Sequence, residues 1–386
     1  MKGIQEIKIG IIGGGQLGKM ILIEANRMNL KTLVLDSNKN SPCKNLCNNF
    51  YIGKLDNYND ILKFGKRCDI ITFEIEHINI DALFKLENMG KKVYPKPHTL
   101  SIVQDKSKQK KFYNENNLPT SKYSYYENIN DLFFNIKNGK IQFPCVWKKT
   151  KFGYDGFGVK VLRSEKDTLD LPDCEMIIEE FVPFKKELAV IVARNFNGEI
   201  KTYETVEMEF NSFSNQVEYV ISPSKISEEL NKKAINIAIE ATKKLDVIGL
   251  LAVEMFLTDE DNIVINEVAP RPHNSGHFTI EACPTSQFEQ HLRSILNLDL
   301  GNTNHDGCAI MLNLVGGEGF EGNVRYENLN EIFSEENTHL HIYGKEKTRP
   351  NRKMGHITII CDKFENGYKK AKSIKEKIKV KAIENE

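Results

Sequence analysis

The sequence predicts a mixed fold with a parallel α/β layer at the N-terminus, a central α+β region and a small C-terminal part. Three observations predict it. Strand and helix patterns alternate through the first hundred residues, successive antiparallel-looking strands begin near residue 141, and 386 residues exceed what one ordinary hydrophobic core holds. We therefore predict domains at 1–100, 101–298 and 299–386, with one lobe of the central domain at about 141–207.

The N-terminal layer is predicted from a βαβ opening. Residues 7–13 form a short apolar run that ends in glycine, which is typical of a buried strand. Apolar residues then recur at helical spacing from Leu17 to Met28, and residues 31–36 form a second strand. Residues 69–74 and 91–95 add strands to the same layer. A βαβ order predicts a parallel sheet.

In the central and C-terminal parts of the sequence, predicted strands and helices alternate less regularly. A Lys-rich helix is expected at 104–117, because the following Leu118-Pro119 disfavours helix. A helix carrying Leu230 to Leu245 on one face follows the antiparallel strands, and Ser286-x-x-Glu289 is a capping box that opens another helix. The predicted strands are 143–149, 158–162, 176–181, 187–193, 201–208, 250–257 and 262–269, with 308–316, 339–344, 355–360 and a Lys-rich helix beyond residue 300.

Charge and composition narrow the class of protein. Lys+Arg and Asp+Glu both number 53, so the formal net charge is zero, which disfavours tight non-specific nucleic-acid binding. The sequence contains no signal-peptide pattern and no run long enough to span a membrane, so we expect a cytoplasmic protein with no membrane or nucleic-acid partner. Its eight cysteines are scattered, which predicts reduced packing thiols without disulfides or a zinc site.

A first glycine loop, Gly13-x-Gly15-x-x-Gly18, follows the first strand and opens a helix, and Asp36 ends the next strand. This satisfies the dinucleotide fingerprint, whose backbone N–H groups can face an anion at a helix N-terminus. An ordinary tight strand-to-helix turn explains the pattern equally well. The strands after residue 100 look antiparallel and do not continue the βαβ pattern. The second mononucleotide-binding half of a dinucleotide fold is therefore missing, which disfavours nicotinamide binding.

A second glycine loop, residues 151–158 (KFGYDGFG), joins two predicted strands and lacks the ending of a Walker loop. Its backbone amides can cover phosphates as a moving flap, and Lys148 on the incoming strand can reach the same phosphates. An ordinary flexible hairpin is the competing interpretation.

Two glutamates, Glu254 and Glu267, interrupt apolar strands that we expect to be neighbours. Two carboxylates about 4 Å apart repel by about 4 kcal/mol at an effective dielectric of 20, and a divalent cation reverses that sign. Hard oxygen ligands suit Mg²⁺ that bridges phosphates. The alternative, that each glutamate points to water or pairs with Arg271, is equally consistent with the pair alone.

Two donor-rich segments follow. Residues 271–277 (RPHNSGH) form a predicted loop, since Pro272 and Gly276 oppose the helix that a His273–His277 zinc pair would need. Residues 345–353 contain five basic residues in a constrained turn. That turn is a candidate phosphate pocket, with a solvated charged surface as the alternative.

Taken together, GIIGGGQLGKM, KTKFGYDGFG, INEVAPRPHNSGH and KTRPNRKMGH resemble the 5-(carboxyamino)imidazole ribonucleotide synthase family of ATP-grasp enzymes over nearly the whole chain. The resemblance implies a pre-ATP-grasp domain, a two-lobed ATP-grasp domain and a small C-terminal domain. It implies ATP-dependent carboxylation of 5-aminoimidazole ribonucleotide with bicarbonate, through carboxyphosphate, in purine biosynthesis. It also implies Mg²⁺ and a homodimer.

The same resemblance assigns residues to roles. ATP contacts would come from Lys106, Lys148, Gly153, Tyr154, Asp155, Gly156, Phe157, Gly158, the adenine hinge Glu179, Glu180, Phe181 and Val182, and from Glu187, Glu207, Asn266 and Glu267. Glu254 and Glu267 would ligate the metal. Bicarbonate and carboxyphosphate would contact Tyr154, Asp155, Arg271 and His273. The ribonucleotide would contact Gln16, Leu17, Glu74, Asn274, Lys345, Arg352 and Lys353.

The sequence departs from the family pattern at a few positions. Lys106 stands where an arginine is usual, which keeps the charge but loses bidentate geometry. Phe152 and Val159 replace the usual flap neighbours, and the segment after Glu207 is unlike the usual polar run, which puts the role of Glu207 in doubt.

Three other functions stay open at this point. A formate-using ligase acting on glycinamide ribonucleotide would share the first glycine loop and the basic turn, although it tends to carry Asp where Asn274 stands. A nicotinamide oxidoreductase is supported only by the first glycine loop and Asp36. A non-catalytic nucleotide sensor is opposed by the intact metal carboxylates and flap.

Overall fold

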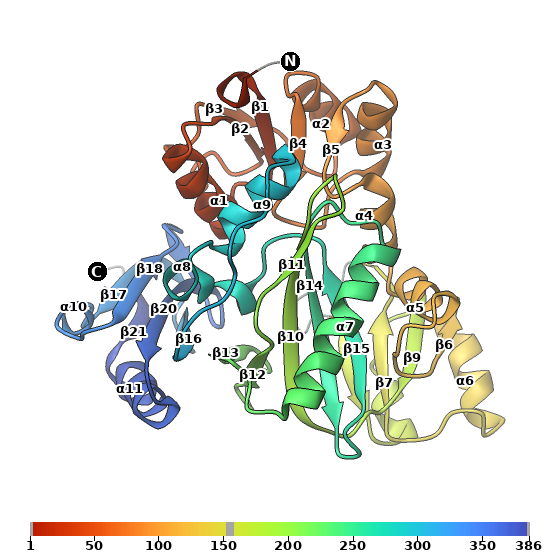
Figure 1. The fold of residues 1–386 in the computed structure, drawn as a ribbon. Coiled ribbons are helices and arrows are strands. Elements are labelled where there is room, and N and C mark those ends of the chain that lie inside the picture. Colours follow the sequence, from red (N-terminus) through yellow and green to blue (C-terminus); the bar gives the residue numbers. More distant parts are fainter. Residues whose placement is uncertain (1–2, 152–157, 384–386) are drawn as a thin grey trace.

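The computed structural model describes residues 3–151 and 158–383. The N-terminal layer, at the top of Figure 1, is a five-stranded parallel sheet in the order β3-β2-β1-β4-β5, which confirms the predicted βαβ opening. Its strands are β1 (Lys8–Ile12), β2 (Lys31–Asp36), β3 (Asn49–Ile52), β4 (Ile70–Phe73) and β5 (Lys92–Val93).

Helices cover both faces of this sheet, so its three central strands, β1, β2 and β4, are mostly buried and apolar, whereas the edge strand β3 is partly exposed. Ile9 and Ile11 pack toward α1 and α9, whereas Ile71 and Phe73 pack toward α2, α3 and α4. The helices are α1 (Gln16–Arg27), α2 (Tyr58–Gly65), α3 (Ile80–Asn88), α4 (Pro97–Val103) and, from far along the chain, α9 (Gln287–Leu296), after the short 3₁₀ turn η1 (Ile4–Glu6). The sequence analysis did not identify α2, α3, α4 or β3.

A small antiparallel sheet in the order β6-β9-β7-β8 lies beside the central sheet (Figure 1). It comprises β6 (Tyr123–Tyr126), β7 (Cys145–Lys149), β8 (Val159–Leu162) and β9 (Met176–Glu180), with α5 (Lys106–Glu115), α6 (Ile129–Lys137) and η2 (Glu165–Thr168) around it. The predicted strands of this lobe and the helix at 104–117 are confirmed within a few residues. The predicted flap lies between β7 and β8 in the sequence, and most of it lies outside the described residues.

The largest sheet has nine strands, in the order β15-β14-β10-β12-β13-β16-β20-β18 with β11 paired to β10. Leu188, Val190 and Val192 on one face of β10 pack with α7, and Ala189 and Ile191 alternate onto the other face. The elements are β10 (Phe184–Arg194), β11 (Ile200–Thr202), β12 (Val206–Phe210), β13 (Val217–Ser222), α7 (Glu228–Lys244), β14 (Gly249–Thr258), β15 (Ile263–Ala269), β16 (Cys308–Val315), β18 (Thr338–Ile342) and β20 (Lys353–Cys361).

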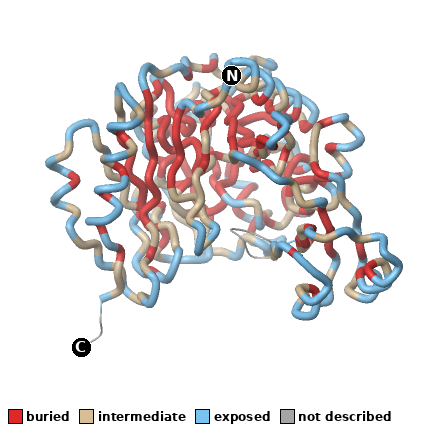
Figure 2. The backbone as a smooth tube through the Cα atoms, turned by 90° about the horizontal axis from the view of Figure 1, so that it is seen from below, coloured by how far each residue is buried: buried red, intermediate tan, exposed pale blue. Residues whose placement is uncertain are grey.

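This sheet runs through the predicted boundary at residue 298, because β13 pairs with β16 from Tyr219↔Leu312 to Ser222↔Ala309. The boundary itself stays a prediction. A three-stranded sheet and two helices complete the C-terminal part: β17 (Gly322–Glu327), β19 (Lys347–Thr348), β21 (Lys379–Ala382), α10 (Asn330–Phe333) and α11 (Phe364–Lys377). Figure 2 shows that the buried residues concentrate in the strands, while the outer helices expose one side.

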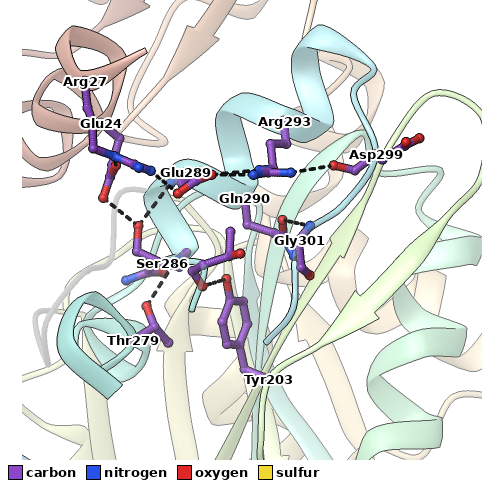
Figure 3. Close-up of polar contacts among 12 residues, drawn as sticks. Glu24, Arg27, Tyr203, Thr279, Ser286, Glu289, Gln290, Arg293, Asp299 and Gly301 are labelled. Carbon is purple, nitrogen blue, oxygen red and sulfur yellow. Dashed lines mark hydrogen bonds and ion pairs between the residues drawn. The ribbon is translucent and has the colours of Figure 1, made fainter. Parts of the chain in front are cut away.

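The helix α9 ties the N-terminal layer to the central region (Figure 3). The carboxylate of Glu289 accepts hydrogen bonds from Arg27 of α1 and from Arg293 Nε at 2.8 Å, and Ser286 Oγ donates to Glu24 Oε1 at 3.0 Å. Ser286 caps α9 by accepting the Glu289 amide at 3.2 Å, as predicted. The capping box also predicts a hydrogen bond from the Ser286 backbone amide to the Glu289 side chain, and this prediction is wrong for the described contacts. The Glu289 carboxylate instead binds two guanidinium groups.

The prediction that all cysteines are reduced and unpaired is wrong for one pair of cysteines. Cys308 and Cys361 are cross-strand partners on β16 and β20 and form a disulfide, with their Cα atoms 5.2 Å apart. They are separated by 53 residues in sequence, so their pairing depends on strand register. Over the two described stretches of chain, no helix is both long and apolar enough to cross a bilayer.

Candidate active site

The two glutamates lie opposite each other, as predicted: Glu254 on β14 and Glu267 on β15 are direct cross-strand partners. The register shifts at the next pair, Met255↔Ile265, which leaves Asn266 as the extra residue of a β-bulge. A bulge re-aims the side chains on either side of it. Here it lets Asn266 Oδ1 accept a hydrogen bond from Lys148 at 3.1 Å while Glu267 Oε2 accepts one from Lys106 at 2.7 Å.

The two carboxylates are electrostatically unequal. The charge of Lys106 holds the pKa of Glu267 below its ordinary value, whereas burial and then the charge of Glu267 raise the pKa of Glu254. Burial also lowers the pKa of His273 to about 3, so the imidazole is neutral near pH 7 and its Nε2 lies 3.2 Å from Glu254 Oε1. The alternative that both glutamates simply point to water does not apply, because Glu254 is 15% exposed and lies against His273, while Glu267, whose side chain is 45% exposed, is paired with Lys106.

The predicted phosphate-binding lysines converge on these carboxylates from the smaller lobe. Lys106 begins α5, whose N-terminus is capped by Asp105 through the amides of Ser107 (3.0 Å) and Lys108 (3.3 Å). Lys148 on β7 forms an ion pair with Glu179 Oε1 at 3.0 Å. The remaining hinge residues, Glu180, Phe181 and Val182, lie where the chain passes from β9 in the small sheet to β10 in the large one.

The structure places Glu187 and Glu207, both predicted to contact the nucleotide, on opposite faces of the sheet. Glu187 lies on the same face of the sheet as Glu254, and burial together with the charge of Glu267 raises its pKa to about 7. Glu207 is the cross-strand partner of Leu188 and so points to the opposite face, where it pairs with Lys186. The structure therefore does not bring Glu207 to the other candidates, because side chains alternate along β12.

The loop after Glu267 is held by polar contacts. Arg271 Nε lies 2.7 Å from Glu76 Oε1, and Asn274 exchanges hydrogen bonds of 2.9 Å with Asn313 on β16. The buried side chain of Gln287 accepts from His273 N at 2.9 Å and donates to His273 O at 2.8 Å. Only Asn274–Gly276 are helical, as the 3₁₀ turn η3, so the predicted non-helical loop is confirmed apart from this single turn.

Three amides of the first glycine loop donate to carboxylates of the chain itself, which agrees with the interpretation of this loop as a strand-to-helix turn. Gly14 N donates to Asp36 Oδ2 at 2.6 Å, and Gly15 N and Gly18 N donate to Glu74 at 2.8 Å and 3.4 Å. Gln16 is half-buried at the start of α1, while the Leu17 side chain is 6% exposed within the core. The carboxylates of Asp36 and Glu74 thus occupy three amides at and just before the start of α1.

The basic turn lies beside the segment that follows Asp36. Lys19 of α1 donates to Ile342 O at 2.8 Å, and Asn40 Nδ2 donates to Glu346 at 3.0 Å. A cavity of about 310 Å³ lies here, lined by Asn40, Ser41, Pro42, Lys44, Asn45, Gly344 and Glu346. Lys345 is half-buried and donates to Lys353 O at 2.6 Å, and Arg352 donates to Lys347 O at 2.5 Å. These backbone contacts hold the turn in place.

Some candidates cannot be placed and some residues were missed. Gly153, Tyr154, Asp155, Gly156 and Phe157 lie outside the described residues, and Gly158 is described with φ of 77°. The sequence analysis missed Ser41, Glu76, Lys110 and Gln287. Ser41, Glu76 and Lys110 each stand within five residues of a candidate, Asp36, Glu74 and Lys106 respectively, whereas Gln287 does not. Within residues 3–151 and 158–383, no cluster of three His, Cys, Asp or Glu side chains could hold a metal by itself.

Three domain families match successive parts of the chain. These are the ribonucleotide synthetase preATP-grasp domain at residues 6–104, the ATP-grasp domain at 111–288 and the phosphoribosylaminoimidazole carboxylase C-terminal domain at 309–370. The observed architecture therefore has the three parts that the resemblance implied.

Complete relatives are similar over almost the whole chain. The N5-carboxyaminoimidazole ribonucleotide synthase of Bacillus subtilis is 38% identical over 91% of this chain and 91% of its own length. The chloroplastic phosphoribosylaminoimidazole carboxylase of Vigna aconitifolia is 39% identical over 93% of this chain but only 65% of its own length. The chain thus spans less than two thirds of that longer relative.

Solved structures agree with these sequence matches. The N5-carboxyaminoimidazole ribonucleotide synthetase of Thermotoga maritima has a TM-score of 0.89 at 41% identity, covering 98% of this chain and 100% of that one. An Aspergillus clavatus N5-carboxyaminoimidazole synthase in complex with ADP and 5-aminoimidazole ribonucleotide has a TM-score of 0.87 at 30% identity, covering 97% of this chain and 99% of that one.

Proposed function

The chain belongs to the N5-carboxyaminoimidazole ribonucleotide synthase family, and from that membership we propose that it carboxylates 5-aminoimidazole ribonucleotide with bicarbonate at the expense of ATP. The observation that carries the proposal is the arrangement of Glu254 and Glu267 on neighbouring strands, with Lys106 and Lys148 reaching them from the smaller lobe. This is a site that can hold a nucleoside triphosphate between two lobes and stabilise charge on its phosphates.

The reaction has two steps with balanced atoms. A bicarbonate oxygen attacks the γ-phosphorus of ATP, the bond to the β-phosphate breaks, and ADP leaves with the electron pair. The exocyclic amine then forms a C–N bond to the carboxyl carbon of carboxyphosphate, or to the CO₂ it releases; the C–O bond to phosphate breaks, phosphate leaves with the electron pair, and the amine gives up one N–H proton to phosphate or solvent. Lys106 and Lys148 orient the triphosphate, and Arg271 and His273 orient bicarbonate near Glu254. Because neutral His273 adds no positive charge of its own, Arg271 supplies the attraction for the anion.

Mg²⁺ is the cation that the donors at this site fit. Two carboxylates and the Asn266 amide oxygen are hard oxygen donors, and because Glu254 and Glu267 are direct cross-strand partners, a divalent cation between them would relieve their mutual repulsion. Glu254 and Glu267 would hold the ion, which when bound neutralises charge on the transferring phosphoryl group.

The ribonucleotide is proposed to occupy the cavity between the segment 40–45 and the basic turn. Lys345, Arg352 and Lys353 would hold its 5′-phosphate, with Gln16, Glu74 and Asn274 toward the sugar and base. The buried hydroxyl of Ser41, which has no hydrogen-bond partner among the described residues, lines the same cavity and adds a candidate contact. A homodimer in the cytoplasm completes the proposal, and sedimentation of the purified chain tests the dimer.

The test is ADP release by the purified full-length chain. ADP formation should depend on both 5-aminoimidazole ribonucleotide and bicarbonate, and should not occur with formate and glycinamide ribonucleotide. Glu267→Ala should lower the rate by at least about a thousandfold, because several kcal/mol of charge stabilisation are lost. Glu260→Ala, on the exposed turn after β14, is the matched control and should leave the rate unchanged. Folded wild-type protein that releases no ADP with these substrates would contradict the proposal.

A further inference from the structure

A second buried ion cluster lies directly behind the phosphate-binding lysine and contains a residue to which no role has been assigned, Lys110. It consists of Lys110 on α5, Glu179 on β9 and Lys148 on β7, whose side chains are 3%, 5% and 9% exposed. Charged side chains are rarely this buried unless they are paired, so the cluster needs an explanation.

Every donor of the Lys110 ammonium group is used. Its Nζ contacts Thr120 Oγ1 at 2.7 Å, Ser121 Oγ at 2.8 Å and Glu179 Oε2 at 3.0 Å. Ser121 Oγ in turn donates to the same Glu179 oxygen at 2.7 Å. The segment of Thr120 is fixed to the carboxylate strand, because Ile265 N donates to Pro119 O at 2.8 Å. Lys110 is therefore rigidly held against one oxygen of Glu179.

The other oxygen of Glu179 faces Lys148. Lys148 Nζ lies 3.0 Å from Glu179 Oε1 and 3.1 Å from Asn266 Oδ1, beside the Glu254–Glu267 pair. With two lysines and one glutamate, the cluster carries a formal charge of +1. A neutral Lys148–Glu179 pair would attract an anion weakly, whereas the cluster with Lys110 leaves one positive charge unbalanced.

We propose that Lys110 is a positioning residue for Lys148: it balances the charge of Glu179, so that Lys148 can bind the nucleotide phosphates without competition from that carboxylate. The inference rests on the proposed contact between Lys148 and ATP. Glu179 holds the Lys148 side chain in place, and Lys110 keeps Glu179 paired when Lys148 turns toward phosphate.

The charges in the cluster are consistent with this role. Burial raises the pKa of Glu179, but the charges of Lys148 and Lys110 outweigh burial and hold the pKa below its ordinary value. Burial lowers the pKa of Lys110 to about 8, which leaves it mostly protonated near pH 7. A merely structural role would not require charge, because well-packed apolar residues often replace buried ion pairs without loss of stability.

The experiment measures the Kd of β,γ-methylene ATP for four forms of the full chain by calorimetric titration in the presence of Mg²⁺. Lys110→Met should weaken binding by about tenfold or more, because Glu179 then competes with the phosphates for Lys148. The double variant Lys110→Met/Glu179→Gln removes both the counter-charge and the competitor, so it should bind several-fold more tightly than Lys110→Met. Lys111→Met, at a 71% exposed side chain on the same helix, is the control and should match wild type.

Several outcomes overturn the proposal. One is an unchanged Kd in Lys110→Met, and another is a double variant that folds with an unaltered thermal midpoint yet binds as weakly as Lys110→Met. If Lys110→Met does not fold, Lys110→Arg decides: it keeps the positive charge beside Glu179, so it should bind within about threefold of wild type, and tenfold weaker binding by the folded variant refutes the idea. Because this readout is nucleotide affinity, it separates the inference from the carboxylation proposal, which is tested by substrate-dependent ADP release.

Discussion

At the scale of single residues, Glu74 shows how a carboxylate can serve the fold and the site together. It is 8% exposed and accepts the amides of Gly15 and Gly18 at the start of α1. Burial raises its pKa to about 7, while the Gly15 hydrogen bond and the charge of Arg271 act against that rise. The carboxyl is therefore costly to ionise in the folded chain, although it accepts two amides of the glycine loop.

We predict a pH dependence of stability from Glu74. Its folded pKa lies above its unfolded pKa, so the folded chain holds the proton longer, and its contribution to the free energy of unfolding falls as pH rises from about 4.5 to about 7. The change amounts to about 3 kcal/mol. Glu74→Gln should remove it, so the variant should gain stability relative to wild type between pH 5 and pH 8 in urea unfolding. A constant difference between the two proteins across this range would refute the assignment.

At the scale of elements, α9 connects the N-terminal layer to the central sheet. The Glu289 carboxylate, whose side chain is 10% exposed, receives Arg27 from α1 and Arg293 from its own helix (Figure 3). Tyr203 from the segment after β11 donates to Thr285 O at 2.9 Å, just before the helix begins. One short helix thus joins three regions that are distant in sequence.

We predict that Glu289→Gln lowers the free energy of unfolding by about 1–3 kcal/mol, because two guanidinium groups lose a shared, largely buried partner. Arg27→Ala should cost less than about 1 kcal/mol, since the Arg27 side chain is 60% exposed. Denaturant unfolding of both variants checks the order. Equal losses would show that the exposed pair, and not the buried carboxylate, supports the contact.

The elements also show which features the sequence could reveal. Glu254 and Glu267 were predicted to be neighbours because each interrupts an apolar strand, and consecutive strands usually pair. The opposite orientations of Glu187 and Glu207 were missed, since they follow from the register between β10 and β12. The bulge at Asn266, the clamp of Gln287 on His273 and the role of Lys110 behind Lys148 likewise depend on contacts between distant segments. The Cys308–Cys361 disulfide was missed for the same reason.

At the scale of the whole molecule, the nine-stranded sheet connects the central and C-terminal parts through backbone hydrogen bonds. The β13 residues Tyr219, Val220 and Ile221 are at most 3% exposed, and they pair with β16. Without β16, an apolar and unpaired strand edge would face water. Because they share this sheet, we expect the central and C-terminal parts of the chain not to fold independently of each other.

We predict that a chain ending at residue 298 does not fold into a stable nucleotide-binding protein, whereas the full chain unfolds its central and C-terminal parts in one transition. Hydrogen exchange should show β13 and β16 opening with the same free energy. A soluble 298-residue fragment with a cooperative unfolding transition and wild-type affinity for β,γ-methylene ATP would refute this view of the sheet.

The cavity between residues 40–45 and the turn at 344–346 has a consequence for how the protein comes into being. A ribosome finishes both carboxylate strands at Ala269, but Gly344 and Glu346, which close the far wall of the cavity, are made several seconds later at about 5–20 residues per second. The lysines and glutamates assigned to the nucleotide are thus translated well before the proposed acceptor site is complete. A chain released early would therefore contain the residues assigned to the nucleotide but lack one wall of the proposed acceptor pocket.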